Sequence, residues 1–274
     1  MPQSTPVESP PAAAAGTLAI GGDLLVHRLG FGAMRLTGPG VWGPPPDRAQ
    51  ALRVLRRALE LGVNFIDTAD SYGPHVSEEI IAEALHPYPP GLVIATKGGL
   101  TRAGAGQWER DARPSHLRAA CEGSLKRLRL NRIDLYQLHA ADPRVPLEDS
   151  LGELARLRTE GKIRHIGVSN FDAAQLARAQ RVVTVVSVQN RYNLKDRTSE
   201  AVLKDCERAG IAFIPWFPLG AGRDATNAQG AIAWLLARSP VMLPIPGTSS
   251  VKHLEENVAA AAVRLSAEDL RKLH

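Results

Sequence analysis

The feature that most constrains this chain is a regular alternation of short apolar runs with segments of helical period. Eight runs are candidates for buried strands: residues 29–34, 63–66, 92–96, 133–138, 163–168, 185–188, 211–215 and 241–245. Between them leucines recur at helical spacing, as at Leu52, Leu55 and Leu59. Continuous apolar runs are typical of strands buried on both faces of a parallel sheet. Eight such strands, each followed by a helix at roughly thirty residues per unit, predict an α/β fold of the (β/α)8 TIM-barrel type.

The competing architecture is a doubly wound open sheet, which usually carries a glycine-rich phosphate loop after its first strand. Residues 30–35 begin like that loop but place Arg35 where the third glycine belongs. No acidic residue at the end of a second strand, about twenty residues further on, completes the pattern. The barrel is therefore the favoured interpretation.

The N-terminal region divides into two parts. Two apolar segments, residues 17–20 and 24–26, flank Gly21, Gly22 and Asp23, which predicts a β-hairpin. Residues 1–16 are rich in proline, alanine and serine and lack the basic and apolar regions of a signal peptide. We expect a disordered tail at 1–16 and one barrel domain at 17–274.

Charge and cysteine usage narrow the class of protein further. The net charge is +5, but the lysines and arginines are scattered along predicted helices without an aromatic-basic motif, which indicates a solvated face and no nucleic-acid partner. No apolar stretch approaches the roughly 18 residues that would span a bilayer, so no membrane partner is expected. Cys121 and Cys206 have no metal-ligand neighbours in the sequence. We interpret both as reduced and buried, with no metal site, which favours a cytoplasmic location.

Polar or aromatic residues follow six successive predicted strands. They are Asp67, Lys97, His139, Ser169 with Asn170, Gln189, and Trp216 with Phe217. Taken singly, each has an ordinary explanation, such as a helix cap or a surface cation. In a barrel, however, the carboxyl ends of all strands meet at one mouth. The sequence therefore predicts a polar site there.

Tyr72, in the loop after Asp67, suggests what this site does. A tyrosine hydroxyl has a pKa of about 10, so it donates a proton at neutral pH only where its phenolate is stabilised. The ammonium group of Lys97 would supply that stabilisation, and Asp67 would keep the ammonium charged and oriented. His139 would hydrogen-bond a substrate oxygen. Together these groups predict a proton-donating site for carbonyl reduction, with the hydride supplied by another molecule.

Longer stretches resemble the successive motifs of the aldo-keto reductases, in the same order. The matching stretches are residues 62–73, 95–97, 134–139, 161–171 and 244–248. The resemblance runs from about Leu29 to the C-terminus and implies an NAD(P)H-dependent oxidoreductase on a TIM barrel. It implies Tyr72 as the general acid, with Lys97 and Asp67 tuning its acidity. His139 would orient the carbonyl.

The resemblance also implies a set of cofactor-binding residues. These are Ser169, Asn170 and Gln189 for the carboxamide, Trp216 for stacking on the nicotinamide, Pro218 and Leu219 beside it, Gly247, Thr248, Ser249, Lys252 and His253 at the phosphate end, and Glu256 and Asn257 at the adenine. The start of the helical run at 251–262 is a site that favours anions.

Three departures from the family bear on cofactor choice. Relatives often carry a lysine where Gly247 stands and an arginine where His253 stands, so we expect weaker recognition of a 2′-phosphate. The segment between 219 and 227 is shorter than in most relatives, which place a helical segment beside the pyrophosphate there. NADPH is still favoured over NADH, because no acidic residue sits where it would repel that phosphate.

The substrate is a small carbonyl compound by the same resemblance. Residues 38–48 and 72–76 are similar to the branch that contains bacterial pyridoxal reductases. Trp42, Trp108 and Phe217 would offer aromatic faces to pyridoxal or another aromatic aldehyde, although Trp42 would equally well serve only to cover the barrel.

Two other functions stay open at this point. One is a Schiff-base lyase that uses Lys97, a known use of barrel lysines. The other is a non-catalytic NADPH-binding regulatory subunit, because the chain also resembles channel-associated relatives. The sequence leaves the oligomeric state undetermined.

Overall fold

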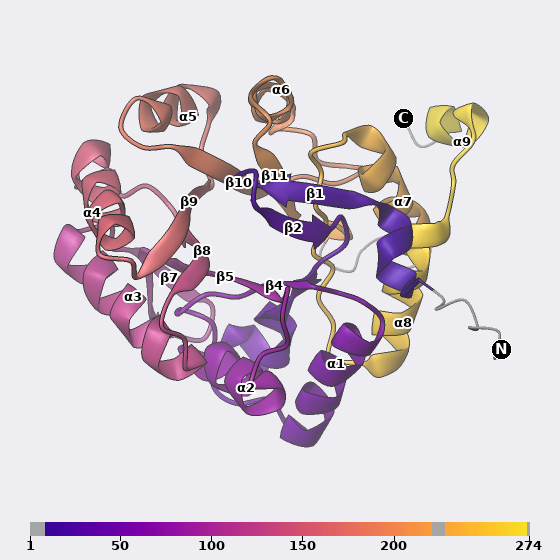
Figure 1. The fold of residues 1–274 in the computed structure, drawn as a ribbon, viewed down its shortest axis with the longest axis horizontal. Coiled ribbons are helices and arrows are strands. Elements are labelled where there is room, and N and C mark those ends of the chain that lie inside the picture. The colour runs from indigo at the N-terminus through magenta and orange to yellow at the C-terminus, as the bar shows by residue number, and fades with distance from the viewer. Residues whose placement is uncertain (1–8, 221–227, 273–274) are drawn as a thin grey trace, which may run out of the picture.

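A computed structural model of the chain describes residues 9–220 and 228–272, and a seven-stranded parallel sheet with helices outside it forms its centre (Figure 1). The sheet contains β3 (Phe31–Gly32), β4 (Phe65–Asp67), β5 (Val93–Gly98), β8 (Ile133–Leu138), β9 (Ile163–Ser169), β10 (Val185–Arg191) and β11 (Ala212–Trp216). Neighbours in the sheet follow this chain order without exception. Their carboxyl ends therefore lie at one edge, as expected for repeated βαβ units.

Helices connect and cover these strands. They are α1 (Arg48–Glu60), α2 (Val76–Leu85), α3 (Pro114–Leu128), α4 (Leu147–Thr159), α5 (Ala173–Gln180), α6 (Glu200–Ala209), α7 (Ala228–Arg238), α8 (Val251–Ala259) and α9 (Ala267–Lys272). The predicted leucine stripes face inward, since Leu55 of α1 and Leu151 of α4 are fully buried. Cys121 and Cys206 are free and buried, and burial raises the pKa of both thiols to about 12. Within the described ranges, no helix is both long and apolar enough to cross a bilayer.

The eighth predicted strand, residues 241–245, differs from the prediction. Within the described chain it forms only a single parallel bridge, between Met242 and Phe213. Its backbone still contacts both edges of the sheet: Leu243 N donates to Phe213 O (2.9 Å), and Gly30 N donates to Pro244 O (3.0 Å). Proline has no N–H, so a segment that contains Pro244 and precedes Pro246 has lost donors that a regular ladder needs. This irregular segment joins the two edge strands.

The predicted N-terminal hairpin is confirmed as β1 (Thr17–Ile20) paired antiparallel with β2 (Leu24–His27). Ile20 and Val26 are buried in the same cluster as Phe65 and Val93, the first residues of β4 and β5. The hairpin therefore covers the N-terminal end of the sheet, and in Figure 1 it lies across the middle of the molecule. The strands' carboxyl ends open on the opposite side.

Part of the tail that was predicted to be disordered is ordered. Residues 1–8 lie outside the described chain, but Pro11–Ala15 forms a short 3-10 helix, η1. Ala12 is fully buried, and its N–H donates to Leu61 O at the end of α1 (2.9 Å). Proline at the first helical position presets φ, and small alanine side chains allow close packing. The proline- and alanine-rich composition that suggested disorder is thus compatible with a short helix that packs against the end of α1.

Shorter elements were not predicted. They are η2 (Ala33–Leu36), η3 (Pro39–Val41), the antiparallel hairpin of β6 (Leu100–Gly104) with β7 (Gln107–Arg110), and η6 (Ala260–Ala262). The first three follow the carboxyl ends of β3 and β5, where the predicted site lies.

Candidate active site

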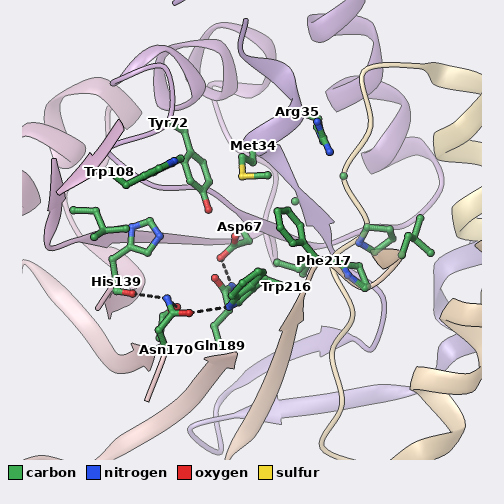
Figure 2. Close-up of a pocket in the computed structure, with 18 residues that line it drawn as sticks. Met34, Arg35, Asp67, Tyr72, Trp108, His139, Asn170, Gln189, Trp216 and Phe217 are labelled. Atoms are coloured by element: carbon green, nitrogen blue, oxygen red, sulfur yellow. Dashed lines mark hydrogen bonds between the residues drawn. The ribbon is translucent and has the colours of Figure 1, made fainter. Parts of the chain in front are cut away.

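A cavity of about 440 Å³ lies at the carboxyl ends of the strands (Figure 2). It brings together most of the residues predicted from sequence: Asp67, Tyr72, Trp108, His139, Ser169, Asn170, Gln189, Trp216, Phe217, Pro218, Leu219 and Gly247. These residues are far apart in the chain and come from several strands and the loops that follow them. The prediction that the strand ends converge on one site is therefore confirmed.

Asp67 and Lys97 form a buried ion pair beneath the cavity. The Nζ atom of Lys97 donates to both carboxylate oxygens of Asp67 (2.8 Å each) and to Thr68 O (2.7 Å). Lys97 is 0% exposed, so its ammonium reaches no solvent. Burial lowers the pKa of Lys97, and the carboxylate of Asp67 works against that change. Asp67 Oδ1 also accepts from Gln189 Nε2 (2.8 Å), which ties β4 to β10 across the sheet.

Tyr72 is buried beside this pair. Its ring centroid lies 5.3 Å from Lys97 Nζ, 5.9 Å from the His139 ring and 6.3 Å from the Trp108 ring. Burial, and then the carboxylates of Asp67 and Asp70, raise the pKa of Tyr72 well above its ordinary value.

That Lys97 makes Tyr72 more acidic stays a prediction. All three hydrogen bonds of the Lys97 ammonium go to Asp67 and Thr68, and the Asp67 carboxylate offsets its charge. Burial, together with the carboxylates of Asp67 and Asp70, keeps the phenol protonated at neutral pH.

His139 follows β8 and faces the cavity. Burial, and then the charge of Lys97, hold the pKa of His139 well below its ordinary value, so the imidazole is neutral. Its Nδ1 lies 3.5 Å from the Ser71 hydroxyl. When that hydroxyl donates to Nδ1, the ring proton sits on Nε2, where it is available to a ligand.

Asn170 organises the side of the cavity near β11. Its backbone has a φ of 60°, in the left-handed region that asparagine tolerates better than most residues. Its Nδ2 donates to His139 O (3.0 Å) and Ser169 Oγ (3.1 Å), while its Oδ1 accepts from Trp216 Nε1 (3.1 Å). Trp216 is thereby held by a side-chain hydrogen bond and packs edge-on against Phe217, with ring centroids 4.9 Å apart.

Eight predicted residues do not line the cavity: Lys97, which lies beneath it, and Trp42, Thr248, Ser249, Lys252, His253, Glu256 and Asn257. Most lie at the start of α8, where Ser250 caps the helix by accepting from His253 N (3.4 Å). Trp42 is partly exposed and lies 5.7 Å from the guanidinium of Arg102. The segment predicted to be short, after Gly220, falls at residues 221–227, outside the described chain.

Six further residues line the cavity and were not predicted as site residues: Gly32, Met34, Arg35, Leu100, Ile245 and Pro246. In the sequence, Arg35 stands out only because it replaces the third glycine of a phosphate-loop pattern. Its position directly after the first strand was a usable signal, because that loop also faces the barrel mouth.

The site defines a class of protein: an oxidoreductase that acts on a carbonyl carbon and takes its hydride from a separate cofactor. A phenol that holds its proton, a neutral imidazole and a buried lysine–aspartate pair meet in one cavity with aromatic walls. The donors present fit a nicotinamide, because hydroxyl and amide groups suit its carboxamide and the Trp216 ring provides a flat apolar wall.

The chain belongs to the aldo/keto reductase family, whose model matches residues 28–227 and 223–274. As a member, it is an oxidoreductase that uses a nicotinamide cofactor. The chain is 50% identical to an uncharacterised oxidoreductase of Schizosaccharomyces pombe, over 96% of this chain and 90% of that protein. It is 45% identical to pyridoxine 4-dehydrogenase of Escherichia coli, over 92% of this chain and 95% of that protein.

A solved structure extends the comparison to the fold. An aldo-keto reductase from Klebsiella pneumoniae in complex with NADPH superimposes with a TM-score of 0.80 at 27% identity, over 94% of this chain and 93% of that one. The order of strands and helices described above is therefore that of a family fold.

Proposed function

We propose that this protein reduces an aldehyde or ketone to an alcohol with NADPH, on a closed (β/α)8 barrel, and that Tyr72 supplies the proton. The observation that carries the proposal is the placement of a buried, protonated phenol within 6.3 Å, ring to ring, of both His139 and Trp108 and directly above the Lys97–Asp67 pair. The backbone contacts of residues 241–245 with both sheet edges, and the similarity to solved relatives, support a closed barrel.

Each side chain has a role in this scheme. NADPH, when bound, supplies the hydride to the carbonyl carbon. The neutral imidazole of His139 donates a hydrogen bond to the carbonyl oxygen and fixes its position. Tyr72 transfers its proton to that oxygen as negative charge develops there. The Lys97 ammonium then stabilises the phenolate electrostatically, and Asp67 keeps the ammonium oriented.

Cofactor binding is assigned by the same reasoning. Ser169, Asn170 and Gln189 would hold the carboxamide, and Trp216 would pack on the ring, with Pro218, Leu219 and Gly247 alongside. Thr248, Ser249, Lys252, His253, Glu256 and Asn257 would contact the phosphate and adenine end. The NADPH complex of the Klebsiella pneumoniae relative supports NADPH over NADH. A single domain over 17–274 and a cytoplasmic location belong to the same proposal.

The proposed substrate is pyridoxal or another flat aromatic aldehyde. Trp108 stands perpendicular to Tyr72, with 88° between the ring planes, and Phe217 lies on the far side of the cavity (Figure 2). Aromatic walls of this kind favour an aromatic ring. The 45% identity to a pyridoxine 4-dehydrogenase supports a pyridine ring in particular.

The two other functions fit less well. A Schiff-base lyase needs a free lysine amine, whereas Lys97 is buried and makes three hydrogen bonds. A subunit that only binds the cofactor does not need the four catalytic side chains, which are Asp67, Tyr72, Lys97 and His139.

The test is Tyr72→Phe. We expect kcat for aldehyde reduction to fall by about 100-fold or more, because the proton donor is lost, while the Kd for NADPH, read from fluorescence, stays within about twofold. Tyr88→Phe is a matched control, since the Tyr88 hydroxyl donates to Leu128 O away from the cavity. Retained activity in Tyr72→Phe would contradict the assigned role. A kcat/KM for pyridoxal no higher than for aliphatic aldehydes would contradict the proposed substrate.

A further inference from the structure

Arg35 is a charged residue of the cavity wall that the chemistry above does not use. It lies on η2, three positions after Gly32, the last residue of β3, and its side chain is exposed. Among the described residues, none forms a hydrogen bond or an ion pair with its guanidinium. Arginines elsewhere in the fold, such as Arg48 and Arg178, pair with glutamates. An unpaired arginine in a cavity wall is available to an anionic ligand.

The backbone next to Arg35 leaves no room for a side chain at residue 247. A Cβ atom added at Gly247 would collide with the carbonyl oxygen of Gly32, so residue 247 is restricted to glycine. The same Cβ position lies 3.7 Å from Arg35 Cγ. Arg35 is therefore in van der Waals contact with this glycine and is the charged side chain on this part of the wall, among the residues that line the cavity.

The direction of the side chain separates it from the reacting carbonyl. Figure 2 shows Arg35 on the opposite side of the cavity from Tyr72 and His139, with Met34 between them. Arg35 does not point toward the phenol or the imidazole. An anion bound at its guanidinium is thus remote from the oxygen that accepts the proton, which fits a cofactor phosphate better than a substrate group.

We propose that Arg35, beside Gly247 in the cavity wall, binds a phosphate of the dinucleotide cofactor. The inference rests on the proposed function, since it assumes that a nicotinamide dinucleotide lies in this cavity. The planar guanidinium matches a phosphate with two parallel hydrogen bonds, whereas an ammonium group offers a point charge. Two phosphate groups have the required chemistry: the pyrophosphate, which NADPH and NADH share, and the 2′-phosphate of NADPH.

The experiment is a fluorescence titration of wild type, Arg35→Gln and Arg35→Lys with NADPH and with NADH. We expect Arg35→Gln to raise the Kd for NADPH about tenfold or more, because a charge-assisted contact is lost, and Arg35→Lys to recover part of it. A loss shared by NADPH and NADH assigns the pyrophosphate. A loss confined to NADPH assigns the 2′-phosphate. Arg53→Gln on the exposed face of α1 is the control for the change in net charge.

The failure of this inference is distinguishable from the failure of the proposed function. A wild type that binds NADPH, together with an Arg35→Gln variant of unchanged Kd for both dinucleotides, overturns the role of Arg35 alone. A raised KM for a carboxylated benzaldehyde with unchanged dinucleotide Kd overturns it too, because it assigns Arg35 to the substrate. A wild type that binds neither dinucleotide overturns the proposed function.

Discussion

At the scale of single residues, one carboxylate oxygen connects much of the site. Asp67 Oδ1 accepts from Lys97 Nζ, Gln137 Nε2 (3.3 Å) and Gln189 Nε2, donors that lie 30, 70 and 122 positions further along the chain. The three donors lie on three different strands, β5, β8 and β10. The hydrogen bonds of this oxygen therefore depend on the register of these strands as well as on the charge of the lysine.

Removing the lysine alone should therefore be costly. Lys97→Met leaves the Asp67 carboxylate buried without its cation, and we expect about 3–5 kcal/mol less stability in urea unfolding. The double variant Asp67→Asn with Lys97→Met should recover much of that loss, because it removes the uncompensated charge. Strictly additive effects of the two substitutions would contradict the coupling.

The pH dependence of the reaction follows from two shifted groups. The pKa of His139 is lowered from 6.5, so the imidazole is already neutral at pH 6.5, and the pKa of Tyr72 is raised from 10.0, so the phenol is still protonated at pH 10. We expect kcat/KM for reduction to be flat between these limits, since it reports groups of the free enzyme. The measurement is a pH series with a folded-state check at each point. A break near pH 8 would contradict either assignment.

The sequence predicted which residues meet, but not how they are charged. Asp67, Tyr72, Lys97 and His139 were identified because each follows a strand, and parallel strands end together. The expected acidification of Tyr72 stays a prediction, because it depends on burial and on where the Lys97 ammonium points, which the sequence does not encode. Arg35 was missed because an unpaired cation is recognised only once its neighbours are placed.

At the scale of elements, the β6–β7 hairpin is held by one side chain. Arg102 donates to five carbonyl oxygens, those of Gly40, Val41, Ser71, Gly104 and Gln107. Its guanidinium lies 3.7 Å from the Trp108 ring centroid. These hydrogen bonds join the hairpin to η3 and to the loop after β4, and the cation–π contact holds Trp108 next to Tyr72. Since β7 is exposed throughout, it lacks the apolar alternation that predicts strands, which explains why the hairpin was missed.

Arg102→Leu should loosen this hairpin. We expect faster amide hydrogen exchange across residues 100–110 and a KM for aromatic aldehydes raised about tenfold, with a smaller change for short aliphatic aldehydes that do not need the Trp108 wall. Arg110→Leu is the control, because Arg110 lies on the same hairpin but takes no part in the hydrogen bonds of Arg102. Exchange rates in Arg102→Leu equal to those of wild type would contradict the role of Arg102 in holding the hairpin.

At the scale of the whole molecule, the alternation of apolar runs predicted most of the architecture. Residues 63–66 and 92–96 correspond to β4 and β5 within two residues at each end, and residues 133–138 coincide with β8. The last run failed as a strand because Pro244 and Pro246 remove donors. The tail failed because its alanines dock on α1, a long-range contact that composition does not encode.

The N-terminal hairpin should contribute stability without contributing to chemistry. Ile20 is 1% exposed and packs beneath the sheet, so Ile20→Ala should lower the free energy of unfolding by about 2–5 kcal/mol while kcat at 20 °C or below, under conditions where the variant is folded, is unchanged. Leu25→Ala is the matched control, since Leu25 lies on the same strand pair but is 62% exposed and should change stability by less than about 0.5 kcal/mol. An equal loss in both variants would contradict the packing role.

The hairpin's position has a wider consequence for how such a protein can be altered. Because the hairpin packs against the amino ends of the strands, whereas the reactive groups lie at their carboxyl ends, we expect thermal stability and choice of carbonyl substrate to be separately adjustable. Substitutions that stabilise the hairpin should leave the loops at the carboxyl ends of the strands free to change. We therefore expect that a gain in thermal stability does not require a loss of activity.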